Sequence, residues 1–252
     1  RRTLFTRLAW SCASTFRHTD YQGGCNGAWI RFSPQSKWPS NAGLDSALAL
    51  LDPIQKHFGH GLSWADLIVL AGNTALESAS NETNAVDWAE TLTPTVPFCP
   101  GRTDAPDAGT LAQQSAQEHL APRILGNGND TAAALKYSMA LMGLTNREIV
   151  ALKQQVWRLE DRNPALSNHY YRTLLTETWD LHDPKAGVYK AAGKGGTLML
   201  KTDLLLRWDA EFLAIAQEFA SDRAAFLADF SSGWTKMMNA DRYSGPGGNL
   251  CG

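Results

Sequence analysis

A stripe of apolar side chains near the start of the chain constrains the fold more than any other feature. Residues 4–17 read LFTRLAWSCASTFR, and the main apolar positions in this segment are Leu4, Leu8, Cys12 and Phe16. Apolar side chains spaced three or four residues apart lie on one face of an α-helix. We therefore predict a helix whose apolar face is buried in the core.

Arg7, Trp10 and Ser11 interrupt this stripe. The phrase from Arg7 to Trp10 resembles the distal helix of the class I haem peroxidases, which include cytochrome c peroxidase, ascorbate peroxidase and catalase-peroxidase. In that family a His follows the Trp and transfers protons, while the Arg stabilises the charge that develops as the O–O bond breaks. Ser11 occupies the position of the His, and its hydroxyl is no base near neutral pH without a helper. We interpret Arg7 and Trp10 as a remnant distal site.

Further segments resemble this family in the same order along the chain. They are GGCNG at 23–27, IRF at 30–32, NAGL at 41–44, SWADLIVLAG at 63–72 and VPFCPGRTD at 96–104. The segment at 63–72 opens with a pattern like a capping box, Ser63 with Asp66, and continues as a largely apolar run. We therefore expect a buried helix there. The long insertion that carries the cross-linking Tyr of catalase-peroxidases is absent before residue 96.

Asn41 has two possible roles. In the family, an Asn in this phrase hydrogen-bonds the distal His and sets its basicity. The resemblance therefore makes Asn41 a remnant of the distal site, although its partner is replaced by Ser11. Alternatively, Asn41 is the N-cap of a helix that runs to about His57. The sequence leaves both roles open.

A second departure from the family lies after the phrase LTNREIVAL. The family carries its proximal iron ligand, a His, where this chain has Val156, which cannot bind iron. The proximal loop is also deleted, because Asn163 follows only seven residues later. Asp203 resembles the carboxylate that holds the proximal His and tunes its basicity. Without that His, Asp203 either caps the following helix or pairs with Arg207.

The resemblance implies an all-α haem-peroxidase fold of about ten helices in two lobes. We expect a single domain over residues 1–252, with a distal lobe to about residue 129 and a proximal lobe over the rest. In the family, haem lies between the two lobes.

Composition excludes several other classes of protein. The chain has 252 residues, a formal net charge of −2 and 44% hydrophobic residues. These values suit one large soluble domain or two closely packed lobes. No basic excess indicates nucleic-acid binding, and no apolar run approaches the roughly 20 residues of a membrane-spanning helix.

The two losses, at Ser11 and Val156, favour a pseudoenzyme without haem over an enzyme. Similar losses occur in the non-haem C-terminal halves of catalase-peroxidases and in an ascorbate-peroxidase-like protein of the thylakoid lumen associated with photosystem II. That resemblance implies a scaffolding or regulatory subunit with protein partners in a larger organellar assembly, in a plastid or a mitochondrion. We expect bulky residues such as Trp157 to refill the former haem cavity.

The alternative is a haem b peroxidase of the ascorbate peroxidase type with an unusual iron ligand. Cys12 lies next to the distal position, and thiolate is a haem ligand in other proteins. His169 and His182 are candidates from the other lobe. The presence of Arg7 and Trp10 motivates this alternative.

The cysteines and the paired histidines give weaker signals. The four cysteines, Cys12, Cys25, Cys99 and Cys251, lack the spacing of a zinc site. Three disulfide pairings are possible, and Cys12 is most simply a small residue of the core. His57 and His60 are separated by a Gly that ends the helix, so we do not expect them to bind a metal.

Overall fold

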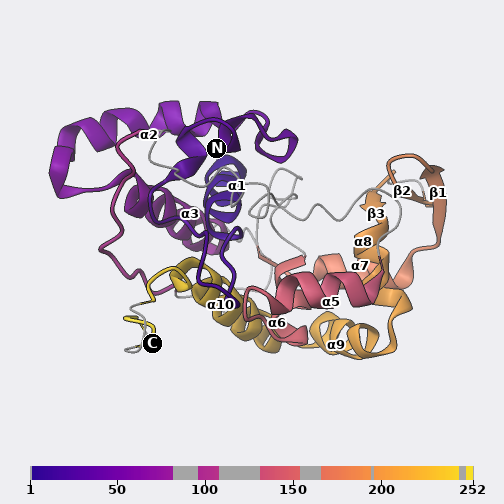
Figure 1. The fold of residues 1–252 in the computed structure, drawn as a ribbon. Coiled ribbons are helices and arrows are strands. Elements are labelled where there is room, and N and C mark those ends of the chain that lie inside the picture. The colour runs from indigo at the N-terminus through magenta and orange to yellow at the C-terminus, as the bar shows by residue number, and fades with distance from the viewer. Residues whose placement is uncertain are drawn as a thin grey trace.

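The computed structural model describes residues 2–81, 96–107, 131–153, 166–193, 196–243 and 248–251. These ranges contain nine α-helices and a small three-stranded sheet (Figure 1). The helices are α1 (Arg2–Ala13), α2 (Asp45–Phe58), α3 (Trp64–Asn81), α5 (Ala132–Ala140), α6 (Asn146–Lys153), α7 (His169–Thr176), α8 (Lys201–Trp208), α9 (Ala210–Ser221) and α10 (Arg223–Asn239). The mainly helical structure agrees with the predicted fold class. The lobe boundary expected near residue 129 lies outside the described ranges.

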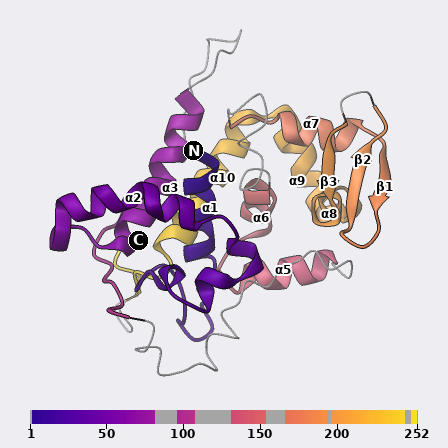
Figure 2. The ribbon, with the colours of Figure 1, turned by 90° about the horizontal axis from the view of Figure 1, so that it is seen from above.

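Helix α10 connects two groups of helices. It packs against α6 and α9 on one side and against α1 on the other. Helices α1, α2 and α3 form one group, and α5 to α9 form the other together with the sheet (Figures 1 and 2). Elements from both halves of the sequence therefore meet along α10.

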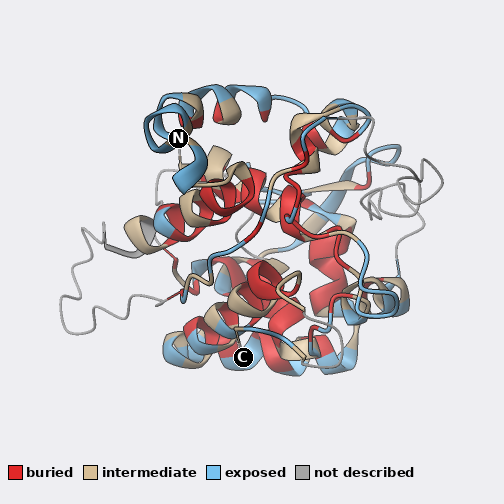
Figure 3. Cartoon of the chain, turned by 60° about the vertical axis from the view of Figure 1, so that its left-hand side comes forward, coloured by how far each residue is buried: buried red, intermediate tan, exposed pale blue. Residues whose placement is uncertain are grey.

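The buried core follows the apolar faces of these helices. Figure 3 shows buried residues concentrated on the inner surfaces of the helices, with exposed residues toward the outside. Leu8, Cys12 and Phe16 are buried, as the stripe in residues 4–17 predicts. Helix α1 approaches α3 closely at Gly72, where an added Cβ atom would lie 2.3 Å from Cβ of Ala9.

The small sheet was not predicted from the sequence. Strands β1 (Trp179–Asp183), β2 (Val188–Ala191) and β3 (Leu198–Leu200) pair antiparallel in the order β1-β2-β3. The turn between β1 and β2 is stabilised by Asp183, whose Oδ1 accepts hydrogen bonds from the N–H groups of Lys185 and Ala186. Aspartate side chains favour such turns, so this signal was present in the sequence.

No helix in the described ranges is long and apolar enough to cross a membrane.

Candidate functional site

The structure brings part of the predicted distal remnant together. Arg7 on α1 donates from Nη2 to the carbonyl oxygen of Ala42 at 3.3 Å, so its guanidinium lies beside the turn that contains Asn41. Ser11 is buried one helical turn further along α1. The ring of Trp10 packs against Trp234 of α10, with the centroids 6.5 Å apart.

Asn41 holds a turn together and does not cap a helix. Its Nδ2 donates to the carbonyl oxygen of Gln35 at 2.8 Å, and the side chain is buried. Helix α2 begins only at Asp45, because Gly43 adopts a positive φ of 81° and separates Asn41 from the helix. The N-cap alternative is therefore wrong. The amide nitrogen of Asn41 thus binds the backbone of its own loop.

Asp203 is the centre of a polar cluster in the other group of helices. Its Oδ2 accepts from the N–H of Leu200 at 2.8 Å, which caps α8. Its Oδ1 accepts from the hydroxyl of Tyr170 at 3.0 Å and lies 4.0 Å from Nζ of Lys153. The capping alternative is confirmed. Arg207 donates instead to the carbonyl oxygen of Glu177 at 2.7 Å.

Lys153 is the last residue of α6, three positions before Val156. Its ammonium group also donates to Oγ1 of Thr202 at 2.6 Å. The carboxylate that would hold a proximal His is thus engaged by a phenol, a backbone N–H and a nearby ammonium group. Val156 and Trp157 lie outside the described residues, so the predictions about them stay predictions.

A row of aromatic rings runs along α10 between the two remnants. Trp234 stacks on Phe230 with centroids 6.2 Å apart, and Phe230 contacts Phe226 at 5.9 Å. Phe226 in turn contacts Tyr171 at 5.4 Å. All four rings are fully buried. Large aromatic side chains of this kind dominate the packing energy of a core, so this part of the interior is densely filled.

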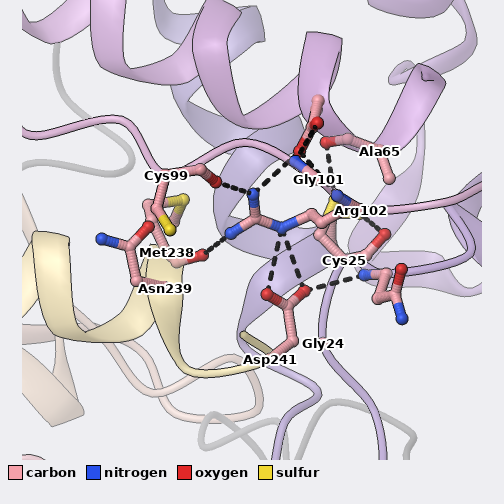
Figure 4. Close-up of polar contacts among 12 residues, drawn as sticks. Gly24, Cys25, Ala65, Cys99, Gly101, Arg102, Met238, Asn239 and Asp241 are labelled. Atoms are coloured by element: carbon pink, nitrogen blue, oxygen red, sulfur yellow. Dashed lines mark hydrogen bonds and ion pairs between the residues drawn. A yellow bond between two sulfur atoms is a disulfide. The ribbon is translucent and has the colours of Figure 1, made fainter. Parts of the chain in front are cut away.

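The segment VPFCPGRTD forms a buried structural site around Arg102 (Figure 4). The guanidinium binds two carboxylates: Nη1 lies 3.0 Å from Oδ1 of Asp66 on α3, and Nε lies 3.0 Å from Oδ1 of Asp241 after α10. It also donates to the carbonyl oxygens of Cys99 and Met238. Burial raises the pKa of Asp241, and the Arg102 charge opposes that shift.

Asp104 of the same segment caps α3. Its carboxylate accepts from the N–H groups of Trp64 at 2.8 Å and Ala65 at 3.0 Å. Ser63 adds a second cap by accepting from the N–H of Asp66 at 3.0 Å, as the capping pattern predicts. The two family-like segments, residues 63–72 and 96–104, therefore stabilise each other in this chain.

A family model described as Peroxidase matches residues 2–155, more than half of the sequence. This chain belongs to the peroxidase family. The resemblance to the class I haem peroxidases is thereby confirmed.

Several catalase-peroxidases resemble this peroxidase-family chain over nearly its whole length. The catalase-peroxidase of Leptospira biflexa is 34% identical over 268 residues, covering 94% of this chain and 35% of that protein. Catalase-peroxidase 2 of Legionella pneumophila (strain Lens) is 33% identical over 273 residues, with 94% and 35% covered. The catalase-peroxidase of Pseudomonas entomophila is 33% identical, with 93% and 34% covered. The chain spans about a third of the length of these relatives.

Haem is the cofactor that the peroxidase family implies, and the three candidate ligands named above do not fit it. Cys12 forms a disulfide with Cys25, so it offers no thiolate, and the hypothesis that Cys12 is an iron ligand is wrong. Its predicted place in the core is confirmed, although it lies there as half of a disulfide. His169 is exposed on α7 beside Thr173 of the same helix, and His182 is exposed on β1. An iron ligand in a haem pocket must instead point into the interior.

The other side chains that could bind a metal do not form a metal site either. His57 and His60 are both exposed. Within the ranges that the structure describes, no group of three or more His, Cys, Asp or Glu side chains could hold a metal ion.

Two features of the site escaped the sequence analysis. One is the engagement of Asp203 by Tyr170 and Lys153, for which only the family's use of that Asp gave a hint. The other is the pairing of Cys99 with Cys251, whose Cα atoms are 5.9 Å apart. Neither contact has a local sequence signal, because both join segments that are distant in the chain.

Proposed function

We propose that this chain is a haem-free member of the peroxidase family without peroxidase activity, which serves as a structural or regulatory subunit of a larger assembly. The observation that carries the proposal is the cluster around Asp203. In an active family member this carboxylate holds the iron ligand. Here the hydroxyl of Tyr170 and the ammonium group of Lys153 occupy its surroundings. Buried polar groups need hydrogen-bond partners, and this carboxylate has its partners without an iron ligand.

The distal side supports the same proposal. Peroxide cleavage needs a base that takes a proton from one oxygen and delivers it to the other. Ser11 stands where the family has that base, and Asn41 binds Gln35 rather than a catalytic group. Arg7 alone can stabilise developing charge but cannot move the proton. The distal remnant is therefore incomplete as a catalyst.

A protein partner is supported by the relatives and by the surface. Because this chain spans about a third of the catalase-peroxidases that it matches, a segment of this kind is part of a longer protein there. The small sheet and α8 also expose large apolar side chains: Leu181, Leu198, Leu200 and Trp208. Leu198 and Leu200 lie on one face of β3, whereas Leu181 is in register with Tyr189 and Met199 on the other face. Two exposed apolar side chains on one face favour a binding role for the Leu198 and Leu200 face. An organellar location rests on the resemblance to the lumenal protein alone, and the relatives reported above give it no support.

Hemin binding tests the absence of haem. The purified protein is incubated with hemin, passed through gel filtration and measured by absorption spectroscopy, and peroxide turnover is assayed with a phenolic electron donor. We expect no Soret band to remain with the protein and no turnover. A band at near one haem per chain would overturn the proposal in favour of the haem b peroxidase with an unusual ligand. Tyr170→Phe then shows whether the Asp203 cluster limits haem binding, because it removes one hydrogen-bond donor from the carboxylate.

Substitution on the sheet tests the partner. A double variant, L198D/L200D, places two charges on one face of β3, and Leu50→Asp on the exposed part of α2 is the matched control. We expect a protein that co-purifies with the wild type to be lost from the double variant and kept by the control. Equal retention by both variants would exclude this face as the contact surface.

A further inference from the structure

Two tyrosines from opposite ends of the chain stack face to face on the surface. The ring centroids of Tyr21 and Tyr243 are 3.9 Å apart, and the ring planes differ by only 9°. Aromatic pairs in proteins usually lie about 4.5–7 Å apart in offset or edge-to-face arrangements. This pair is therefore closer and more parallel than packing alone favours.

The other close pair of tyrosines in the described residues shows the contrast. Tyr170 and Tyr171 are neighbours on α7, with centroids 5.1 Å apart and planes at 83°, and both are buried. Their rings cannot face each other and are shielded from solvent. Tyr21 is 48% exposed, and Tyr243 is half-buried. A reagent in solution can therefore reach the stacked pair.

Tyr21 is held in an unfavourable backbone conformation. Its φ is +57°, which is uncommon for any residue other than Gly and more so for a bulky one. The turn is fixed by hydrogen bonds from Tyr21 N to the oxygen of Arg17 at 2.8 Å and from Arg17 N to the oxygen of Gln22 at 2.9 Å. An ion pair between Arg17 and Asp20 closes the same turn. Such a conformation persists where the surroundings enforce it, and it often marks a functional position.

The backbone at Tyr243 is also held by contacts with the C-terminal residues. It forms a single antiparallel bridge with Asn249, whose Nδ2 donates to the carbonyl oxygen of Asn239 at 2.8 Å. Asn249 also accepts from the N–H of Cys251, which is joined to Cys99 by a disulfide. The two rings therefore face each other from two anchored backbone positions. Reacting groups held in this way react far faster than the same groups free in solution.

We propose that Tyr21 and Tyr243 form an oxidative cross-linking site that yields dityrosine when a one-electron oxidant, such as a haem peroxidase with hydrogen peroxide, acts on this protein. Each phenol loses one electron and one proton and becomes a phenoxyl radical. The two radicals couple through ring carbons ortho to the oxygens, and a carbon–carbon bond forms. The hydrogens on those carbons then move to the oxygens and restore both aromatic rings. The oxidant receives two electrons and two protons, which convert one hydrogen peroxide into two waters.

The orientation of the rings suits this coupling. The pKa of Tyr243 is raised, first by a hydrogen bond with the Tyr21 hydroxyl and then by partial burial. The close and nearly parallel stacking brings the carbons of one ring against those of the other.

Peptide mapping tests the cross-link directly. The protein, at low concentration, is treated with hydrogen peroxide and a catalytic amount of a separately added haem peroxidase, and is then reduced, alkylated and digested with trypsin. Tyr21 is the only tyrosine of the tryptic peptide 18–31, and Tyr243 is the only one of peptide 243–252. Both peptides carry a cysteine, so reduction removes every disulfide link between peptides. We expect mass spectrometry to find these two peptides joined, two hydrogens lighter than their sum, with dityrosine fluorescence in the monomer.

Three variants complete the test. Tyr21→Phe and Tyr243→Phe each keep the ring but remove one phenol, so we expect both to lose the joined peptide and the monomer fluorescence. Tyr137→Phe, at a tyrosine that is 65% exposed, is the matched control and keeps both signals. Circular dichroism checks that the variants fold. The proposal is overturned if the fluorescence persists in Tyr21→Phe, or if dityrosine occurs only in covalent dimers and increases with protein concentration.

Discussion

The hydroxyl of Tyr170 donates a hydrogen bond of 3.0 Å to Oδ1 of Asp203, and both side chains are buried. The bond joins α7 to the first turn of α8. Asp203 caps α8 with its other oxygen, through the N–H of Leu200. One carboxylate thus fixes a helix terminus and the neighbouring helix at once, which is a structural role.

Removing the phenol tests this role. Tyr170→Phe leaves a buried carboxylate oxygen with one fewer donor, and hydrogen bonds to charged groups contribute about 1.5–3 kcal/mol. We expect the free energy of unfolding, measured by urea denaturation, to fall by about that amount. Tyr137→Phe on the surface serves as the control and should change it by less than about 0.5 kcal/mol. Equal stability of the two variants would show that Asp203 does not depend on Tyr170.

Arg102 should be among the most sensitive positions in the chain. Arg102→Ala leaves the carboxylates of Asp66 and Asp241 buried without their cation, and breaking a buried ion pair costs about 3–5 kcal/mol. Lys56→Ala removes an exposed pair with Asp52 and should cost no more than about 0.5 kcal/mol. Guanidinium denaturation compares the two. If Arg102→Ala does not fold, Asp241→Asn provides the measurement, and a loss as small as that of Lys56→Ala would contradict the prediction.

Glu148 should make the protein sensitive to acid. Burial raises the pKa of Glu148, but hydrogen bonds from Lys236, the N–H of Thr145 and Ser232 outweigh it, and the pKa lies below the ordinary value of a glutamate. A lowered pKa stabilises the folded state above the unfolded pKa, and that stability is lost as the pH falls through the folded pKa. Glu148→Gln should therefore cost about 1.5–3 kcal/mol at pH 7.

The difference between wild type and Glu148→Gln should shrink as the pH falls below the ordinary pKa of a glutamate and through the lowered pKa of Glu148, because the wild-type carboxyl becomes protonated. Urea denaturation at a series of pH values measures it. Asp52→Asn, in an exposed pair, is the control and should show no such trend. A difference that is constant with pH would mean that packing, and not charge, accounts for the loss.

The contact between α1 and α3 should not tolerate a larger residue at Gly72. Its Cβ would lie 2.3 Å from Cβ of Ala9, and overpacking costs about 1–3 kcal/mol, which exceeds the gain of up to about 1 kcal/mol from Ala in a helix. Gly72→Ala should lower the melting temperature. Gly61→Ala has open space around the new methyl group and should be nearly neutral. Partial recovery in the double variant A9G/G72A would locate the effect at this contact, whereas no recovery would place it elsewhere.

The two disulfides should differ in their access to reductant. Cys12 and Cys25 are almost fully buried, while Cys99 and Cys251 are half-buried. Because thiol exchange needs access to a sulfur atom, mild dithiothreitol should open Cys99–Cys251 first. Alkylation followed by mass spectrometry identifies the order. The double variant C99S/C251S should lose about 2–4 kcal/mol of stability. Earlier alkylation of Cys12 or Cys25 would show that burial does not control the reaction.

The sequence by itself determined the helices and their buried faces. The apolar spacing in residues 4–17 gives α1, and the Ser63 cap before an apolar run gives α3, because these signals depend only on residues a few positions apart. The order of the family-like segments also established the family and the helical fold class. The prediction that Ser11 replaces the distal base also comes from the sequence alone.

Only the tertiary structure decided which distant groups meet. Asp203 has Tyr170 as its buried partner rather than Arg207, and Asn41 binds Gln35 instead of capping α2. The cysteines pair as Cys12–Cys25 and Cys99–Cys251 among three possibilities, and Tyr21 stacks on Tyr243. Each of these choices depends on where the folded backbone places a side chain. A pattern of neighbouring residues carries no information about that position, because it is set by the packing of all the helices together.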